Sequence, residues 1–357
     1  MKMLFVFLLL FIISFSKPVY LQTNNENVAN QDSIKIAKKA FQFINTPVPH
    51  FDSSNSTDID TSAIRKQFTQ VYKSEPHYFL MRDGKHLYAQ RFEKESKLTV
   101  IVLHGVLSNS LEMNRVSGML RKALNAEVYA LDLRGHGKSD GKPGDIDYVG
   151  QYEDDLVDVI RTVREEKPDG KIVLAGHSMG GGIELRFAMK KDHPKVDGYI
   201  LFAPLLGQNT PTFKKQQDNS DTLGNKKEPF MKIDFPRIIG LKMFNSIGVQ
   251  KYNYLPVLFF NLPKEAPLNK YSYRSDMSMA PDDYKAGLHA VDKPLLVLVG
   301  KNDEVFDASA FVPVIKNNSI GEIAIIKNET HNSIINSMEG MNIIKVWAEK
   351  NGFISKQ

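Results

Sequence analysis

One serine of the sequence stands between two glycines in a G-x-S-x-G pattern, Gly176-His177-Ser178-Met179-Gly180. The apolar run Ile172–Ala175 comes directly before it, and a helix-like segment, Gly181–Lys190, follows. A serine on a tight turn from a strand to a helix presents its hydroxyl at the carboxyl end of the strand, where it can attack a carbonyl carbon. We interpret Ser178 as such a nucleophile; the alternative is a glycine-rich turn with an incidental serine.

A serine nucleophile needs a base, and three histidines follow Ser178 in the chain: His193, His289 and His331. His193 lies in a loop that ends a helix, and His289 precedes an apolar strand, at the wrong edge of a parallel sheet. His331 comes after the strand-like segment Glu322–Ile326, at the carboxyl edge where Ser178 is expected. The sequence therefore predicts His331 as the general base.

The base in turn needs an acid that orients it. Asp303 ends the segment Gly300-Lys301-Asn302-Asp303, which directly follows the apolar run Pro294–Val299, again at a carboxyl end. Asp307 is the competitor, but its position before a helix-like segment is typical of a helix N-cap. We expect Asp303 to be the acid and Asp307 to be the cap.

An oxyanion hole requires two backbone amides that point at the developing negative charge. The amide of Met179, the residue after the nucleophile, is the first. The second is expected in the loop that follows Leu98–Leu103, at Val106, with Leu107 as the alternative. We expect His104 to order this loop by hydrogen bonding rather than to transfer protons.

These residues must be positioned by a regular framework of strands and helices. Continuous apolar runs such as Leu98–Leu103 are typical of buried parallel strands. After Phe79, strand-like and helix-like segments alternate with short links, which predicts an α/β fold with a mostly parallel sheet and helices on both faces. The Asp83-Gly84 dipeptide predicts a hairpin between His77–Arg82 and His86–Phe92.

Several of these segments carry a family resemblance: His104-Gly105, Asp132-Leu133-Arg134-Gly135-His136-Gly137-Lys138-Ser139, Gly176–Gly181, Gly300–Asp303 and His331. With them the chain resembles the α/β-hydrolase superfamily over about Phe79 to Phe353. Within it, the chain is similar to the lysophospholipase and monoacylglycerol-lipase-like group, a relative of the serine aminopeptidases. The resemblance implies an α/β-hydrolase fold and cleavage of esters of single-chain lipids. The stretch Gln208–Pro281 breaks the alternation of strands and helices, and we interpret it as an inserted cap over the ligand edge of the sheet.

The chain divides into four expected parts. Residues 1–16 have the basic start, apolar run and small residues of a secretory signal peptide. Residues 17–76 are expected to form a largely irregular leader with a short helix at 34–43. Residues 77–353 form the α/β-hydrolase domain, with a cap insertion at about 208–281. We expect a secreted or periplasmic protein, or one anchored in the membrane by an uncleaved signal.

Composition excludes several function classes. The chain has no cysteine, so thiolate metal sites, iron–sulfur clusters and a thiol nucleophile are excluded. Its 46 Lys and Arg residues and 41 Asp and Glu residues are spread without a block of like charge, so no nucleic-acid partner is expected. An acidic group at Asp145–Asp158 is interpreted as a helix start and a solvated face rather than a metal site.

We expect a serine hydrolase with Ser178, Asp303 and His331 as its catalytic residues, acting on lysophospholipid or monoacylglycerol through an acyl-enzyme. It would need no cofactor and no metal ion. A general carboxylesterase, an aminopeptidase-like hydrolase of small substrates and a non-catalytic binding protein are the alternatives. The expected cap carries cations among apolar residues, which would suit peripheral contact with a membrane.

Overall fold

A computed structural model describes residues 20–51, 72–214, 228–263 and 265–356 of the chain. The expected signal peptide at residues 1–16 lies outside the described residues. Two compact units are present. The larger comprises residues 48–234 and 251–357, and the smaller comprises residues 1–47 and 235–250.

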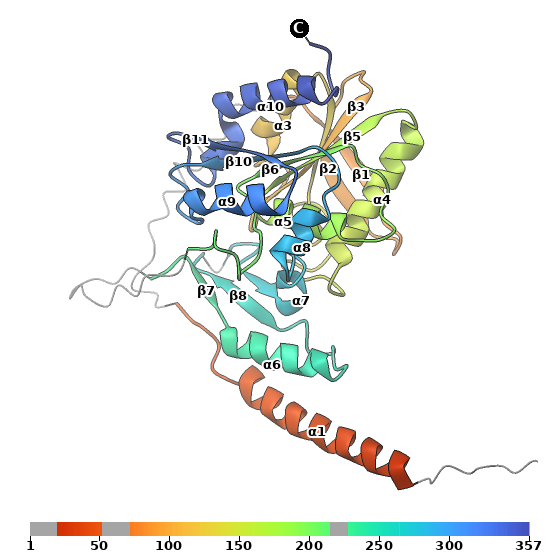
Figure 1. The fold of residues 1–357 in the computed structure, drawn as a ribbon, viewed down its shortest axis with the longest axis vertical. Coiled ribbons are helices and arrows are strands. Elements are labelled where there is room, and N and C mark those ends of the chain that lie inside the picture. The colour runs from red at the N-terminus through yellow and green to blue at the C-terminus, as the bar shows by residue number, and fades with distance from the viewer. Residues whose placement is uncertain (1–19, 52–71, 215–227, 264, 357) are drawn as a thin grey trace, which may run out of the picture. The chain divides into compact units, whose positions relative to one another are not determined.

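The larger unit is built on an eight-stranded sheet with the strand order β1-β2-β4-β3-β5-β6-β10-β11 (Figure 1). β1 and β2 pair antiparallel, β2 pairs antiparallel with β4, and every later neighbour pair is parallel. The strands are β1 Glu75–Leu80, β2 His86–Phe92, β3 Leu98–Leu103, β4 Glu127–Leu131, β5 Lys171–His177, β6 Gly198–Phe202, β10 Leu295–Gly300 and β11 Glu322–Ile326. The mostly parallel sheet that the sequence predicts is confirmed.

Local sequence accounts for these strands. Every residue of β3 and of β10 is buried, as expected of apolar strands that are covered on both faces. The hairpin at Asp83-Gly84 is confirmed, because Leu80 of β1 pairs with His86 of β2 across that turn.

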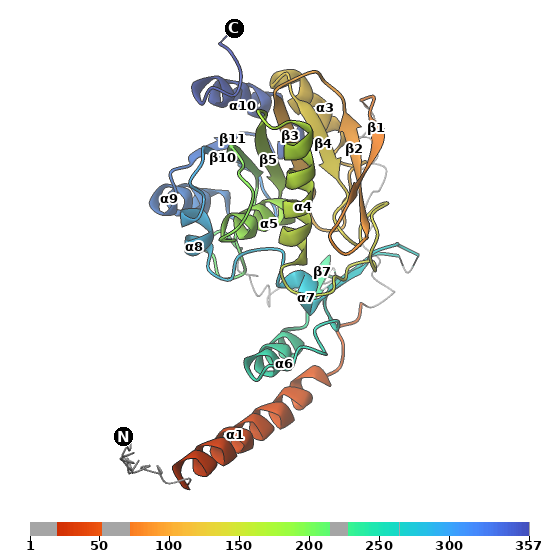
Figure 2. The same cartoon turned by 90° about the vertical axis from the view of Figure 1, so that its right-hand side faces the viewer.

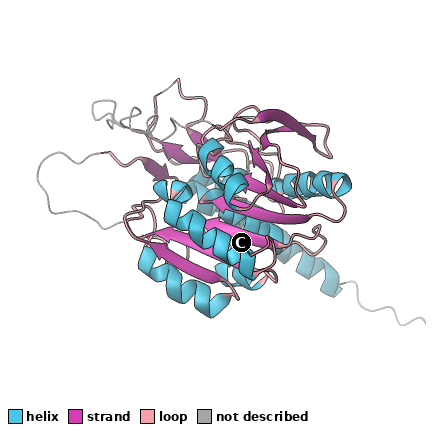
Figure 3. Cartoon of the chain, turned by 90° about the horizontal axis from the view of Figure 1, so that it is seen from above, coloured by secondary structure: helices cyan, strands magenta, loops and turns pink. Residues whose placement is uncertain are grey.

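Helices cover both faces of the sheet (Figures 2 and 3). α3 and α10 pack over one face on a shared apolar core, which includes Leu120 and Trp347, and α4, α5, α8 and α9 lie over the other. Their bounds are α3 Asn114–Ala123, α4 Gln151–Glu166, α5 Met179–Ala188, α8 Tyr284–His289, α9 Ala308–Asn318 and α10 Met338–Lys350. The last helix, α10, begins at Met338, where the Ser337 side chain accepts a hydrogen bond from the Gly340 amide as its N-cap.

A second, three-stranded antiparallel sheet lies within the expected insertion. Its strands are β7 Met231–Ile233, β8 Pro256–Phe260 and β9 Lys270–Ser272, and the short helix α7 Tyr273–Asp276 follows it. The Ser272 amide donates to the Gly144 carbonyl at 2.9 Å, so β9 is tied directly to a loop of the main fold.

The smaller unit pairs α1, Tyr20–Ile44, with α6, Phe235–Ser246. The rings of Phe41 and Phe244 meet edge to face, with centroids 4.9 Å apart. The expectation of a largely irregular leader is therefore wrong for this stretch, where a helix of 25 residues replaces the short one expected at 34–43. Its partner lies almost two hundred residues away in sequence, so local patterning could not reveal the packing that stabilises it.

Within the described ranges, none of the helices is both long enough and apolar enough to cross a lipid bilayer.

Candidate active site

Ser178 occupies a sharp turn between β5 and α5. β5 ends at His177, α5 begins at Met179, and Ser178 itself has φ 51° and ψ −112°. A positive φ is unfavourable for a residue with a side chain and costs roughly 1–3 kcal/mol. The surrounding hydrogen bonds hold this backbone: the Ser178 amide donates to the Phe202 carbonyl at 3.0 Å, and the Leu205 amide donates to the Ser178 carbonyl at 2.9 Å.

The two glycines of the pattern are required by close backbone approach. A Cβ on Gly176 would lie 2.5 Å from the Gly181 nitrogen. A Cβ on Gly180 would lie against the carbonyl of Leu103, at the end of β3. The turn can therefore form only because neither residue has a side chain.

His331 and Asp303 lie together at the carboxyl edge of the sheet. The two side chains form a hydrogen bond of 2.9 Å between His331 Nδ1 and Asp303 Oδ2, and both are buried. The other carboxylate oxygen of Asp303 accepts from the amides of Val305 at 2.8 Å and Phe306 at 2.7 Å. Burial raises the pKa of Asp303, but the hydrogen bond from His331 and these amides outweigh burial and hold that pKa below its usual value.

His177, directly before the serine, contacts the loop that carries His331. Its Nε2 lies 2.9 Å from the His331 carbonyl oxygen, and the two rings are 5.0 Å apart. Burial and the neighbouring His331 lower the pKa of His177 to about 3, so it is neutral and donates from Nε2. This contact brings the base beside the nucleophile turn. Its only sign at the level of sequence is the position of His177 next to Ser178.

Two further contacts of His331 were missed at the sequence level. The Glu304 carboxylate accepts a hydrogen bond from the His331 amide at 3.0 Å. The Phe306 ring meets the imidazole edge to face with a centroid distance of 5.0 Å. Both residues lie within three positions after Asp303, so a single loop holds the acid and also packs the base.

The loop after β3 lies against the nucleophile turn. A Cβ on Gly105 would lie 3.3 Å from Ser178 Cβ and 3.1 Å from His177 Nδ1. The ordering role expected for His104 is confirmed: its Nδ1 lies 2.7 Å from the Gly105 carbonyl oxygen, and its Nε2 accepts from the Leu133 amide at 3.1 Å.

This geometry separates the two candidate amides of that loop. The Leu107 amide donates to the hydroxyl of Tyr271 at 2.7 Å, so it is engaged elsewhere. Within the described residues no hydrogen bond uses the Val106 amide. The Met179 amide is the first of α5, and the first amides of a helix have no partner within the helix.

The competing residues take the structural positions expected of them. Asp307 is the N-cap of α9, and its side chain accepts from the Ser309 amide at 2.9 Å. His289 lies at the end of α8, where its Nδ1 contacts the Lys285 carbonyl. His193 contacts the Pro194 carbonyl beside the ring of Phe187.

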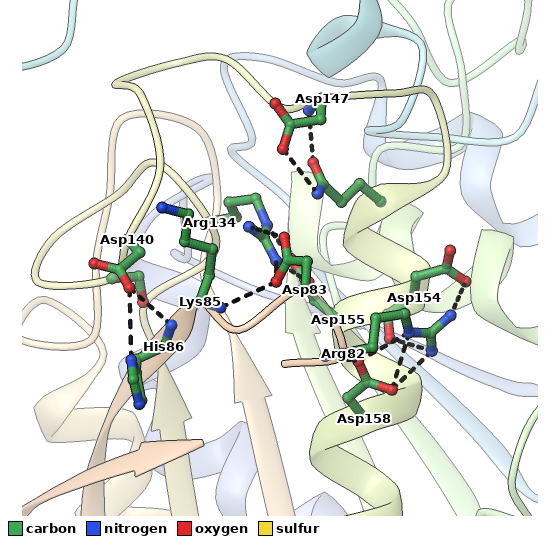
Figure 4. A network of polar contacts seen from close by, with 12 residues as sticks. Arg82, Asp83, Lys85, His86, Arg134, Asp140, Asp147, Asp154, Asp155 and Asp158 are labelled. Carbon is green, nitrogen blue, oxygen red and sulfur yellow. Dashed lines mark hydrogen bonds and ion pairs between the residues drawn. The ribbon is translucent and has the colours of Figure 1, made fainter. Parts of the chain in front are cut away.

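The acidic group is an arginine network rather than a solvated face (Figure 4). Arg82 pairs with Asp158 at 2.7 Å and with Asp154 at 3.3 Å. Arg134 pairs with Asp155 at 2.7 Å, and both side chains are buried. Burial raises the pKa of Asp155 to about 6, although Arg134 opposes the rise. The sequence interpretation is corrected here, because charge patterning alone could not show which carboxylates have guanidinium partners.

Asp145, at the start of the same acidic stretch, is also buried and pairs with Arg274 at 2.8 Å. Among the side chains the structure describes, no group of three or more His, Cys, Asp or Glu residues could hold a metal ion.

Glu184 is a buried acid that sequence reasoning did not single out. It lies on α5 with 0% exposure, and neither carboxyl oxygen has a hydrogen-bond partner among the described residues. Burial raises the pKa of Glu184 well above its ordinary value. The side chain lies behind the elbow, where a Cβ on Gly176 would be 2.8 Å from its Oε1.

Comparison with known proteins agrees with this fold. The family described as "Serine aminopeptidase, S33" matches residues 94–233. Monoglyceride lipase from Rattus norvegicus is 29% identical over 140 residues, which is 39% of this chain and 45% of the relative. The monoglyceride lipase homolog of Monkeypox virus is 25% identical over 244 residues, 64% of this chain and 79% of the relative. The match to the rat enzyme thus spans less than half of that relative's length.

Solved structures match a larger share of the chain at low sequence identity. The structure of DcsB in complex with its substrate analogue has a TM-score of 0.55 and 17% identity, and the match covers 78% of this chain and 99% of that one. A thermophilic esterase from Thermogutta terrifontis has a TM-score of 0.51 and 18% identity, with the same coverage. At such identity these matches establish the fold alone.

Proposed function

This chain is an α/β hydrolase of the monoacylglycerol-lipase-like group, and from that premise we propose that it is a serine hydrolase with Ser178 as its nucleophile. The observation that carries the proposal is the buried hydrogen bond between His331 and Asp303. The loop of His331 also contacts His177, the residue directly before the serine. A non-catalytic binding protein would have no need for an oriented imidazole beside a strained serine.

In the proposed mechanism, Asp303 holds the proton of His331 on Nδ1 and leaves Nε2 free to accept a proton. His331 takes the hydroxyl proton as Ser178 attacks the acyl carbon, and the amides of Val106 and Met179 stabilise the oxyanion. The ester bond then breaks, and the leaving alcohol receives the proton from His331. Water, activated by the same imidazole, attacks the acyl-enzyme and releases the acid and the free serine.

For the substrate, we propose the carboxylic ester of a single-chain lipid, a lysophospholipid or a monoacylglycerol. The relatives named monoglyceride lipase support this class. A general carboxylesterase remains the second candidate, because Ser108-Asn109 stand where monoacylglycerol lipases usually carry Glu-His.

We also propose that the protein is secreted or periplasmic and meets its substrate at a membrane surface. α6 supports the second point, since Phe235 and Ile239 are exposed on it and Lys242 adds an exposed cation. An exposed apolar face with a cation is typical of helices that lie on a lipid surface.

A substrate panel tests the proposed class. Purified protein is assayed with monoacylglycerols, lysophospholipids, p-nitrophenyl esters of increasing acyl length and aminoacyl amides. We expect kcat/KM to rise with acyl-chain length and to be highest for chains of about eight or more carbons, because each buried CH₂ contributes roughly 0.8 kcal/mol. A maximum on acetate or butyrate esters would favour the general esterase, and a maximum on aminoacyl amides would favour the aminopeptidase.

A further inference from the structure

A tyrosine of the second sheet reaches the loop after β3. Tyr271 lies on β9 and is completely buried, and its hydroxyl oxygen accepts a hydrogen bond of 2.7 Å from the Leu107 amide. Leu107 is 164 residues away in sequence and directly follows Val106, whose amide is the proposed oxyanion donor. We infer that Tyr271 is a positioning residue that fixes the Val106 amide for catalysis, an inference that rests on the proposed function.

The loop is close enough to the nucleophile for its position to matter. A Cβ added to Gly105 would lie 3.3 Å from Ser178 Cβ, closer than ordinary van der Waals contact, so the loop lies directly beside the nucleophile. His104 fixes only the start of the loop, through the Gly105 carbonyl and the Leu133 amide. Val106 therefore lies between an end that is held by His104 and an end that is held by Tyr271.

The direction of each hydrogen bond around Tyr271 can be assigned. His136 Nδ1 lies 3.0 Å from the Arg134 carbonyl, which can only accept, so this nitrogen carries the proton. His136 Nε2 is then an acceptor, and it lies 2.9 Å from the Tyr271 hydroxyl. Tyr271 thus donates to His136 and accepts from Leu107, which uses its hydrogen-bonding capacity in both directions.

The network keeps its protons over the pH range in which ester hydrolysis would be measured. Burial and the neighbouring His104 lower the pKa of His136 to about 3, so the imidazole stays neutral. Burial raises the pKa of Tyr271 well above its ordinary value, so the phenol also stays neutral. The link to Leu107 is therefore a constant support and not a pH-dependent switch.

Leu107 needs such support, because its φ of 60° lies in the left-handed region. A leucine seldom adopts this conformation unless surrounding contacts hold it. Without the Tyr271 hydroxyl, the Leu107 amide would be left unpaired and the backbone could relax toward negative φ. Rotation about the Leu107 N–Cα bond would reorient the Val106–Leu107 peptide. Val106 would then shift, and its own amide, which belongs to the preceding peptide, would move away from the oxyanion position.

The test compares two tyrosine-to-phenylalanine variants. Tyr271→Phe removes the hydroxyl and keeps the ring. Tyr273→Phe is the matched control, because Tyr273 is also buried just after β9 but its hydroxyl has no hydrogen-bond partner in the described part of the chain. Turnover of p-nitrophenyl esters, thermal unfolding and fluorophosphonate labelling of Ser178 are measured for the wild type and both variants.

For Tyr271→Phe we expect kcat to fall about tenfold to a hundredfold, and by at least fivefold. KM should stay within twofold of the wild-type value. Complete removal of an oxyanion donor costs about 10²–10³ in kcat, and a displaced donor should cost less. Tyr273→Phe should keep the wild-type kcat. A smaller fall for Tyr271→Phe, a fall that Tyr273→Phe shares, or a change confined to KM contradicts the inference.

Two further measurements probe the mechanism. In the double variant Tyr271→Phe with Leu107→Gly, kcat should recover at least threefold over Tyr271→Phe, because glycine adopts positive φ without steric strain. No recovery would contradict the role assigned to the hydroxyl. In the wild type, which needs no variant to fold, the Leu107 amide should exchange its hydrogen slowly, and rapid exchange would overturn the hydrogen bond itself.

The outcomes separate the inference from the proposed function. If the wild type neither turns over any ester nor reacts with the fluorophosphonate, the proposed function fails and the inference falls with it. If the wild type does both and Tyr271→Phe is equally fast, the inference alone is wrong.

Discussion

Asp303 is held by more donors than any other residue of the proposed triad. One carboxylate oxygen faces His331 and the other accepts from two backbone amides. Because the lowered pKa keeps this buried group ionised, it can stabilise the imidazolium that forms when His331 takes the serine proton. Asp307, only four residues away, is engaged as a helix cap instead.

Exchanging each of these two acids for its amide tests the assignment. Asp303→Asn keeps the size of the side chain but favours the wrong tautomer of His331, so we expect the rate to fall by about 10⁴ with a folded protein. Asp307→Asn is the matched control and should keep the wild-type rate, since asparagine is also a good N-cap. Steady-state kinetics on one chromogenic ester suffice, and the opposite ranking would show that Asp307 is the acid.

At the scale of single elements, the turn from β5 to α5 combines two unfavourable features. Ser178 has a strained backbone. Behind the same turn lies the carboxyl group of Glu184, which has no hydrogen-bond partner among the described residues. Burial raises the pKa of Glu184, so the folded protein keeps the proton of this carboxyl group at higher pH. The unfolded chain loses the same proton above the ordinary glutamate pKa of 4.5. Stability should therefore fall as pH rises above that value.

Glu184→Gln isolates this effect, because glutamine has a similar shape and cannot ionise. At a pH below about 4 the wild type and the variant should have similar free energies of unfolding. Above it, the variant should become progressively more stable, by up to about 1.4 kcal/mol per pH unit until the folded pKa is reached. Urea unfolding between pH 4 and pH 8 measures this, with the exposed Glu165→Gln as the control. A difference that does not change with pH would refute the buried, protonated state of Glu184.

The elements that could be predicted from sequence are those specified by local patterns. β3 and β11 have the expected bounds, and the hairpin at Asp83-Gly84 forms as its turn chemistry dictates. The strand–turn–helix around Ser178 could be predicted for the same reason, since its glycines and flanking apolar residues are contiguous.

The contacts that could not be predicted join residues that are distant in sequence. α1 is paired with α6, Asp155 with Arg134, and Leu107 with Tyr271. None of these partners shares a periodic pattern with the other, so only the fold brings them together. The link at Leu107 engages the amide that the sequence offered as the alternative to Val106, and so favours Val106 as the second oxyanion donor.

On the scale of the whole molecule, the chain carries a formal net charge of +5 at pH 7 and exposes apolar residues on α6. A positive protein is attracted to anionic lipid over a distance of about 10 Å at 0.1 M salt, and about 3 Å at 1 M. Apolar side chains then contribute to binding only at the surface itself.

Vesicle sedimentation tests this proposal. We expect binding to vesicles that contain phosphatidylserine at about 0.1 M salt and much weaker binding at about 1 M. Replacing Phe235 and Ile239 with serine should reduce binding and leave hydrolysis of a soluble short-chain ester unchanged. Equal binding to neutral vesicles at both salt concentrations would contradict the electrostatic part, and equal binding by the double variant would contradict the role of α6.

The most direct test of the central claim is covalent labelling of the proposed nucleophile. The wild-type protein is treated with a fluorophosphonate, digested and sequenced by mass spectrometry, alongside Ser178→Ala. The account predicts one modified peptide, labelled at Ser178, and a Ser178→Ala variant that stays folded, resists labelling and keeps less than about 1% of the esterase activity. Labelling at another residue, or activity above that level in Ser178→Ala, would show that Ser178 is not the nucleophile.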